Sequence, residues 1–510
     1  MEELTPRLRA VCDLHLADVR EMGGRHEYDG KIQDLSPDGV RSGLAGVEQA
    51  RANDRTLEDR HDEAHLTAFE NLVRVEFGQL ELHRRNPLLH LGELDLACYD
   101  RDYAPAGQRA AARLTHLAAW PQAVDNAIAA LDQVSGPVAE ALLGAARGLV
   151  TGIPDEADAA TRDAALAAHA RLVTHLERVA EADSAGTGLG TAALTALMGS
   201  AEAMQLDIGT LAGQADAERD RLRERLAESC ARIDPDRAPL DVARELVREH
   251  PDAAGVIEAA QTWTMRAIEF TRDRDLMPYN DGECLVGLAP PSRRWAMAMM
   301  SSNSPDEPEG PSWYHITPPE DSWPAHEIEE WLEVFSDTTL PGITVHEVAP
   351  GHFSHGRALR RAPTPVRRVL QSMAFVEGWA HYAEELCVEE GFCAPDPRFE
   401  IGVWLEALVR VTRLACAIGV HTAGMTVQEG ARRFEADTHL LGAAALSEAR
   451  RATFDPTYGR YTWGKLVIMN LREKARKDWG MGFTLRRFHT ALMDLGAPPL
   501  GLLETAIERG

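Results

Sequence analysis

Residues 344–352 read Thr344-Val345-His346-Glu347-Val348-Ala349-Pro350-Gly351-His352. This stretch nearly matches the pattern H-E-x-x-H, in which two His side chains on one helix face bind zinc and the Glu between them acts as a base. In a regular helix, six residues at about 100° each would turn His352 well away from His346. Pro350 removes an amide donor and Gly351 tolerates unusual dihedral angles, so we predict a helix distorted between Val348 and His352.

A second segment, residues 375–386, has helical spacing and many side chains of the metal-ligand type. Glu377, His381 and Glu384 stand at positions i, i+4 and i+7 and therefore share one helix face. A catalytic zinc site commonly uses three protein ligands, for example two His and a downstream Glu, and keeps a position open for water. The simplest prediction is therefore that His346, His352 and Glu377 bind one metal ion.

The remaining polar side chains of both segments are expected to assist the three metal ligands. Glu347 points away from the ligand face, so we expect it to take a proton from a water molecule whose acidity the metal has raised. His355 is an alternative ligand to His352, but its separation from His346 favours a hydrogen-bonding or surface role. His381 and Glu384 are expected to orient the ligands.

The same motifs suggest a family. Segments 346–352 and 377–384 resemble two signatures of the DUF885 family, a group of helical proteins regarded as zinc metallopeptidases. A third similar segment comprises Tyr461-Thr462-Trp463-Gly464-Lys465-Leu466, Leu471-Arg472, Phe488-His489 and Gly496-Ala497-Pro498-Pro499-Leu500. The resemblance implies metal-dependent hydrolysis on a large helical metallopeptidase-like fold, and it specifies no substrate.

The third segment supplies candidates for stabilising a transition state. Hydrolysis of an amide creates an oxyanion, and a Tyr or His donor can stabilise it by roughly 3 kcal/mol. Because it lies in the segment similar to the family, Tyr461 is the first candidate for this role, and Tyr458 and His489 are alternatives. Lys465 and Arg472 are candidates either for pairing with a substrate carboxylate or for a helix surface.

Composition limits the partners and the location. A formal net charge of -27 argues against binding to nucleic acid or to anionic membranes, since both require a basic surface. The seven Cys are scattered without a C-x-x-C pair and are typical of reduced thiols. The N-terminal residues lack the pattern of a signal peptide, and no uncharged apolar stretch approaches the length of a membrane span. We therefore expect a cytoplasmic protein, and the oligomeric state is not predicted.

The chain divides into two halves of one continuous, mainly α-helical fold. Amphipathic helices are expected in residues 1–275, for example at 40–52, 56–82, 120–131, 159–182, 217–232 and 253–271. Residues 276–510 form the catalytic half and begin with a small β or irregular insert, in which 284–288 and 312–316 are expected strands and the Met-rich 296–300 is core filler. This insert either holds a substrate backbone at an edge strand or covers the helical core.

We predict a zinc-dependent hydrolase that cleaves a peptide or small amide bond, with one Zn²⁺ or another divalent metal per chain. The main rival is a helical iron-carboxylate oxidase, because Glu377, His381, Glu384 and the two motif His residues also suit iron. A metal-dependent enzyme of specialised metabolism and an inactive scaffold with the same fold are further alternatives.

Overall fold

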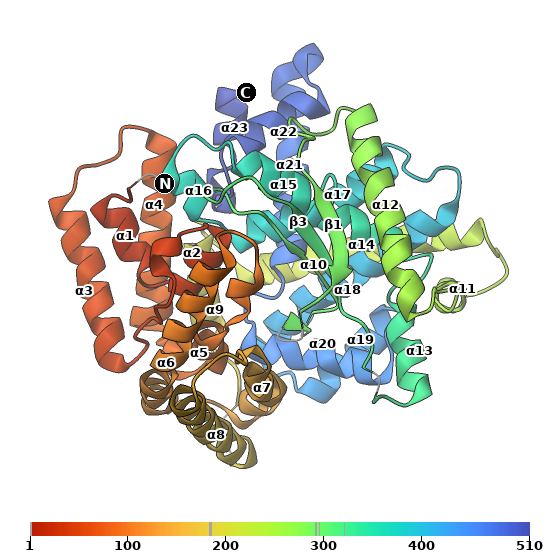
Figure 1. Cartoon of the computed structure of the whole chain (residues 1–510). Coiled ribbons are helices and arrows are strands. Elements are labelled where there is room, and N and C mark those ends of the chain that lie inside the picture. Colours follow the sequence, from red (N-terminus) through yellow and green to blue (C-terminus); the bar gives the residue numbers. More distant parts are fainter. Residues whose placement is uncertain (1–2, 183–185, 291–292, 295, 321) are drawn as a thin grey trace.

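The computed structural model describes residues 3–182, 186–290, 293–294, 296–320 and 322–510. Most of the described chain is helical, and a three-stranded sheet lies near the centre of Figure 1. The predicted mainly α-helical fold, with a small β insert before the helices of the candidate site, is confirmed. None of the helices in these ranges has the length and apolar character that a membrane span requires.

The first half of the chain is a succession of helices, and α1 to α8 occupy the left and lower left of Figure 1. Helices α3 and α8 correspond to the predicted segments 40–52 and 159–182. The segment predicted to start at residue 56 begins only at Arg60, because the Asp59 side chain accepts hydrogen bonds from the amides of His61 and Asp62 and caps the helix. The elements are α1 (Pro6–Cys12), α2 (Leu16–Met22), η1 (His26–Tyr28), α3 (Pro37–Asn53), α4 (Arg60–Val73), η2 (Arg74–Gln79), η3 (Leu82–Arg84), α5 (Pro87–Leu94), η4 (Ala97–Asp100), α6 (Ala106–Ala130), α7 (Gly136–Gly148), η5 (Leu149–Gly152), α8 (Ala159–Glu181), α9 (Thr191–Ala201), α10 (Ile208–Ala231), α11 (Pro239–Leu246) and α12 (Ala253–Asp273).

Two apolar clusters stabilise the N-terminal helices. Helices α5 to α8 pack around Trp120, whose side chain is fully buried. Helices α1, α3 and α4 pack around a second cluster that includes Phe69, and Val366 and Val369 from the C-terminal half complete it. The N-terminal helices are therefore attached to the rest of the chain through shared apolar burial.

The sheet contains β1 (Cys284–Leu288), β2 (Ala298–Ser301) and β3 (Ser312–Ile316) in the order β1-β3-β2. Strand β3 is parallel to β1 and antiparallel to β2. Both predicted strands, 284–288 and 312–316, are confirmed. Met297 and Met300 pack against an apolar cluster, as expected of core filler, but the strand β2 in this segment was not predicted. Successive Met residues give neither the β-branched content nor the alternation that signals a strand.

The second half carries the helices of the candidate site, coloured from green to blue in Figure 1. The elements are α13 (Ala325–Glu333), α14 (Leu340–Glu347), α15 (His352–Leu359), α16 (Pro365–Val369), α17 (Met373–Glu389), α18 (Pro397–Ala423), α19 (Val427–Asp437), α20 (Gly442–Phe454), α21 (Arg460–Trp479), η7 (Gly480–Gly482), α22 (Leu485–Met493), η8 (Leu500–Leu502) and α23 (Thr505–Arg509).

The largest apolar core takes residues from both sides of the predicted boundary at residue 275. Leu211 and Leu222 of α10 belong to it together with Leu405 and Leu408 of α18, and all four side chains are buried. At about 25 cal/mol per Å² of buried apolar surface, such a shared core strongly favours keeping the two halves together.

Two glycines allow α17 and α21 to approach closely. A Cβ atom on Gly378 would lie 2.5 Å from the Cα atom of Gly464, and one on Gly464 would lie 2.0 Å from the carbonyl oxygen of Ala374. Any larger residue would force the helices apart. This contact brings the first turns of α21, with Tyr461, against the helix that carries Glu377.

Candidate metal centre

The helix that carries His346 ends at Glu347, and the next one begins at His352. Between them the backbone leaves the helical region, with φ -104° and ψ -90° at Val348 and φ -71° and ψ -134° at Gly351. The amide of Gly351 donates a hydrogen bond to the carbonyl of Val345 at 3.1 Å, six residues back instead of four. The predicted distortion is confirmed, and it is a complete break in the helix.

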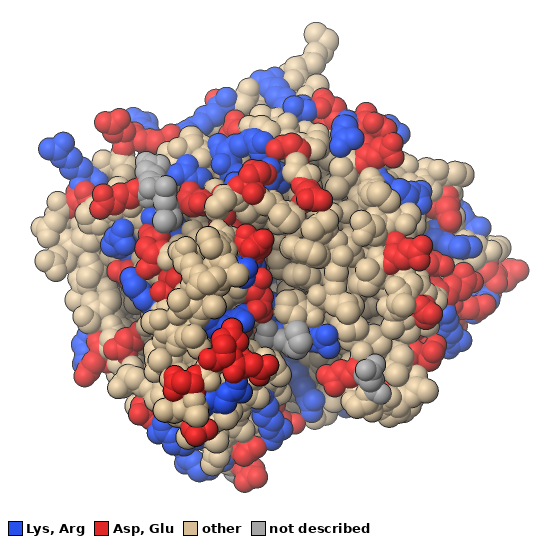
Figure 2. Space-filling model, viewed as in Figure 1, with Lys and Arg blue, Asp and Glu red and all other residues tan. Residues whose placement is uncertain are grey.

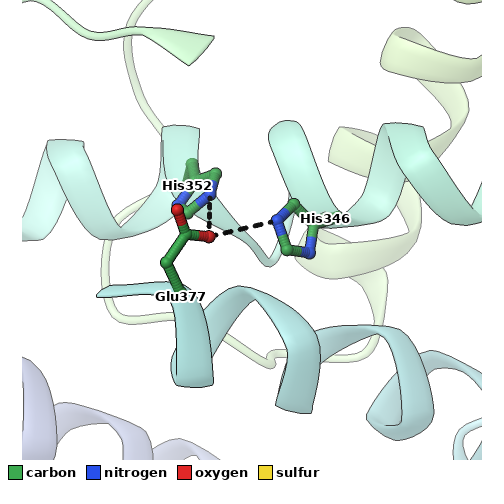
Figure 3. Close-up of side chains that lie close together, drawn as sticks. All are labelled: His346, His352 and Glu377. Atoms are coloured by element: carbon green, nitrogen blue, oxygen red, sulfur yellow. Dashed lines mark ion pairs between the residues drawn. The ribbon is translucent and has the colours of Figure 1, made fainter. Parts of the chain in front are cut away.

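The break turns both imidazoles toward Glu377. Figure 3 shows His346 and His352 approaching the same carboxylate oxygen from different helices. Glu377 Oε2 lies 3.6 Å from His346 Nε2 and 3.4 Å from His352 Nε2. One ligand-type atom from each residue lies within 4.8 Å of the other two, and in the described part of the chain no further group of His, Cys, Asp or Glu has this arrangement.

A carboxylate lies behind His346 and fixes its orientation. Glu384 Oε1 is 2.6 Å from His346 Nδ1, so this ring nitrogen faces the protein and Nε2 faces Glu377. The other oxygen, Oε2, is 3.3 Å from His381 Nδ1 and accepts a hydrogen bond from Arg410 at 3.3 Å. A carboxylate bound to the far nitrogen of an imidazole is a common support for a metal-ligating His.

Sequence reasoning found Glu384 and His381 in this supporting layer but missed Arg410. Its guanidinium is buried, and it also pairs with Glu406 at 3.3 Å. Arg410 lies on α18, outside each of the recognisable motifs, so only the tertiary structure reveals it.

The electrostatics of the cluster favour bound cations. Burial lowers the pKa of His346 and Arg410 lowers it further, but the carboxylates of Glu377 and Glu384 outweigh both and raise it to about 9. Burial would raise the pKa of Glu377, yet its contacts with His346 and His352 hold it well below the usual range. A proton held on His346 therefore occupies the place that a metal cation would take, and metal binding should release it.

Glu347 has the properties of an available base. Its side chain is buried, and its Oε2 atom has no hydrogen-bond partner within the described residues. Burial raises the pKa of Cys284 in β1 and of Tyr314 in β3, and the nearby charge of Glu347 raises both further, so this carboxylate lies on the side of the sheet. A buried carboxylate oxygen without a partner is costly in a folded protein and indicates a group that meets water, ligand or substrate.

Of the three predicted oxyanion donors, Tyr461 alone has a ring contact with a candidate ligand in the described part of the chain. Its ring lies 6.5 Å from that of His346, with an angle of 24° between the planes. Tyr458 instead donates its hydroxyl to Glu448 at 2.7 Å. His489 is fully buried between the Leu276 carbonyl and the Tyr382 hydroxyl, at 2.6 and 3.0 Å, which contradicts its proposed role at the site.

Three more predicted residues are engaged elsewhere. His355 is buried with its Nε2 atom 3.4 Å from the Gly496 carbonyl, so it is absent from the ligand cluster. Lys465 is completely buried and pairs with Glu218 at 3.1 Å and Glu385 at 2.5 Å.

Arg472 donates to both oxygens of Glu389 at 2.7 and 2.9 Å. The expectation that Lys465 or Arg472 either binds a substrate carboxylate or lies on a helix surface was wrong, because both side chains are buried and their charges are already balanced.

Comparison with known proteins gives a family and a fold. A family model described as "Bacterial protein of unknown function (DUF885)" matches residues 19–507. A solved structure described as "a putative lipoprotein of unknown function from Shewanella oneidensis" has a TM-score of 0.78 and 18% sequence identity over 98% of each chain. Another, "the putative lipoprotein from Colwellia psychrerythraea", has a TM-score of 0.80 and 16% identity over 99% of this chain and 97% of that one. A search of curated proteins gave no match. At such identities the likeness to the solved structures shows the fold alone.

Proposed function

The chain belongs to the DUF885 family, and on this premise we propose that it is a zinc-dependent hydrolase that cleaves a peptide or small amide bond. The proposal rests on one observation above all. Two His nitrogens and a Glu oxygen converge within 4.8 Å at a break in a helix, and the adjacent Glu347 has a buried Oε2 atom without a hydrogen-bond partner in the described residues.

The donor set suits zinc. Two imidazoles and one carboxylate are a common ligand set for a catalytic Zn²⁺, and three protein ligands leave one position open for water or substrate. His346, His352 and Glu377 would hold the ion, while Glu384 fixes the tautomer of His346 through its Nδ1 atom. When bound, the ion would act as a Lewis acid that polarises the substrate carbonyl and increases the acidity of water.

Three residues of the chain would transfer the proton, stabilise the oxyanion and support the ligand His346. Glu347 accepts a proton from the attacking water at its unpaired Oε2 atom and later passes it to the departing amine. Tyr461 donates its hydroxyl to the oxyanion that forms as water adds to the carbonyl carbon. Arg410 acts through Glu384, because it neutralises this buried carboxylate and keeps it ionised against His346.

The arrangement of Glu384 disfavours a di-iron oxidase. A di-iron site would need free oxygens of a second carboxylate near Glu377, but Glu384 is engaged with His346, His381 and Arg410. A mononuclear iron site would use the same two His and one carboxylate as zinc. Metal analysis of protein purified without added metal tests the choice, since one zinc per chain supports the hydrolase and iron with oxygen consumption supports the oxidase.

The activity test is a library of dipeptides and N-blocked peptides with mass-spectrometric detection, with and without a chelator. We expect chelator-sensitive cleavage that falls by about two to four orders of magnitude in Glu347→Gln, which keeps the size of the side chain and removes the base. Glu347→Gln should keep its zinc. Undiminished turnover in this variant would eliminate Glu347 as the base.

We also propose a cytoplasmic location. Its support is the absence of disulfides among the seven Cys, all of which lie in the described ranges as free thiols. The two solved structures above are each described as a "putative lipoprotein", so cell fractionation with an antibody to the native protein is the decisive experiment. Recovery in a membrane or periplasmic fraction would contradict the proposal.

A further inference from the structure

A group of arginines lies around Tyr461 and Tyr458, and the Tyr461 ring lies 6.5 Å from that of His346. Arg413 of α18 and Arg460 of α21 have their guanidinium carbons 5.3 and 5.8 Å from the centre of the Tyr461 ring. Arg451 of α20 lies 4.3 Å from the centre of the neighbouring Tyr458 ring. The formal net charge of the chain is -27, and Figure 2 shows acidic and basic side chains mixed over the visible face.

The arginines are not equally well paired. Arg413 donates to both oxygens of Glu448 at 2.7 and 2.8 Å, and Arg460 donates to both oxygens of Asp455 at 2.8 and 2.7 Å. Arg451 reaches only one oxygen of the same Asp455, at 3.4 Å from two of its nitrogens.

Arg451 is also the most accessible of the three, with a side-chain exposure of 30%, against 15% for Arg413 and 16% for Arg460. Since Asp455 already balances Arg460, Arg451 is a surplus cation at the edge of the cluster.

Tyr461 lies between these charges and the metal ligands. Burial raises the pKa of its hydroxyl and Glu377 raises it further, while Arg451, Arg460 and Arg413 lower it. The charge of Glu377 and the charges of the three guanidinium groups therefore act on the pKa of this hydroxyl in opposite directions. Within the described residues it forms no hydrogen bond with the protein, so it remains available to a substrate.

We propose that Arg451, supported by Arg413, binds the C-terminal carboxylate of a peptide whose last peptide bond lies at the metal ligands. This inference rests on the proposed hydrolase and makes it a carboxypeptidase. Guanidinium groups pair well with carboxylates. The contacts of Arg451 with Tyr458, of Tyr458 with Tyr461 and of Tyr461 with His346 connect this cation to the candidate ligands.

The reaction is a simple hydrolysis. A water oxygen forms a bond with the carbonyl carbon, the C–N bond breaks, and a proton from the water goes to the nitrogen of the departing C-terminal amino acid. The same cations would repel the ammonium group of a free N-terminus, which makes an aminopeptidase a poor fit.

Matched peptides test the proposal. N-acetylated tripeptides of identical sequence, ending in either a free carboxylate or a carboxamide, are incubated with the zinc-loaded protein. We expect kcat/KM to be about 10- to 100-fold higher for the acid, the value of a charge-assisted hydrogen bond. In Arg451→Gln this preference should fall to nearly one, and Arg451→Lys should restore part of it.

Arg450→Gln is the matched control. It is the adjacent residue on α20, with a side-chain exposure of 46%, and it pairs with Glu140 at 3.2 Å on the surface. This variant should keep the full preference for the acid. Equal cleavage of acid and amide by the unaltered protein, or an unchanged preference in Arg451→Gln, would overturn the carboxylate assignment and leave the hydrolase standing.

A binding measurement separates the two proposals. Glu347→Gln with zinc should bind the tripeptide acid about 10- to 100-fold more tightly than the amide by titration calorimetry, and Arg451→Gln in the same background should bind them alike. If no peptide is cleaved by the unaltered protein but this binding difference is found, the proposed hydrolase is overturned and the carboxylate site is supported. Equal binding of acid and amide overturns the carboxylate site.

Discussion

Gly351→Ala should disrupt metal binding, although residue 351 is not a ligand. A Cβ atom at this position would lie 1.8 Å from the carbonyl oxygen of His346 and 2.5 Å from that of Val345. Since a carbon atom normally approaches an oxygen to about 3.3 Å, the backbone next to His352 must move by roughly 1.5 Å. Zinc ligands tolerate deviations of only about 0.2 Å.

We therefore expect Gly351→Ala to lose at least about 10- to 100-fold in zinc affinity, and to lose about 1–3 kcal/mol in the free energy of unfolding. Competition with a chromophoric chelator measures the affinity, and circular dichroism with denaturant measures the stability. Gly213→Ala is the control, because a Cβ atom on Gly213 in α10 would meet nothing within 4 Å. Unchanged zinc affinity in Gly351→Ala would refute the role of the helix break.

Three further outcomes follow from contacts and charges. His352→Ala should lose zinc while His355→Ala keeps it, as measured by metal content, because only His352 faces Glu377; the reverse would show that the wrong His was assigned. Lys465→Met should lower the free energy of unfolding by about 3 kcal/mol without changing zinc content, because it leaves Arg221 as the one remaining cation paired with the buried carboxylates of Glu218 and Glu385 in the described residues; an unchanged denaturation midpoint would contradict this. Burial raises the pKa of Glu202 to about 7, so its carboxyl holds a proton more tightly in the folded than in the unfolded chain, and stability from this group falls as pH rises from about 4.5 to 7. Glu202→Gln should remove that part of the pH dependence, about 3 kcal/mol, when unfolding by denaturant is compared at pH 4 and pH 8, and an unaltered dependence would contradict the assignment.

The main features of the site could be predicted from local patterns. The ligand types and the need for a break at Pro350 follow from helix periodicity alone, and Glu384 was identified by its spacing from Glu377. Glu384 supports His346 through a contact across two helices. Its role as an orienting group was therefore expected, but its partner Arg410 was not.

Features that depend on tertiary packing were missed or misread. The short strand β2 has a Met-rich sequence without a strand signal, and pairing with β3 alone makes it a strand. From the sequence, Lys465 was a candidate for binding a substrate carboxylate. The close approach of α17 to α21 at Gly378 and Gly464 instead buries it against Glu385. The arginine group around Tyr461 comes from three helices, and no spacing in the sequence reveals it.

The most direct test of the metal centre is anomalous diffraction at the zinc absorption edge, from crystals of the zinc-loaded protein. We predict one strong peak per chain, at about 2.0–2.2 Å from His346 Nε2, His352 Nε2 and a carboxylate oxygen of Glu377. A peak beside His381 and Glu384 instead, or no peak among these side chains at full zinc saturation, would contradict the proposed metal centre and the hydrolysis that depends on it.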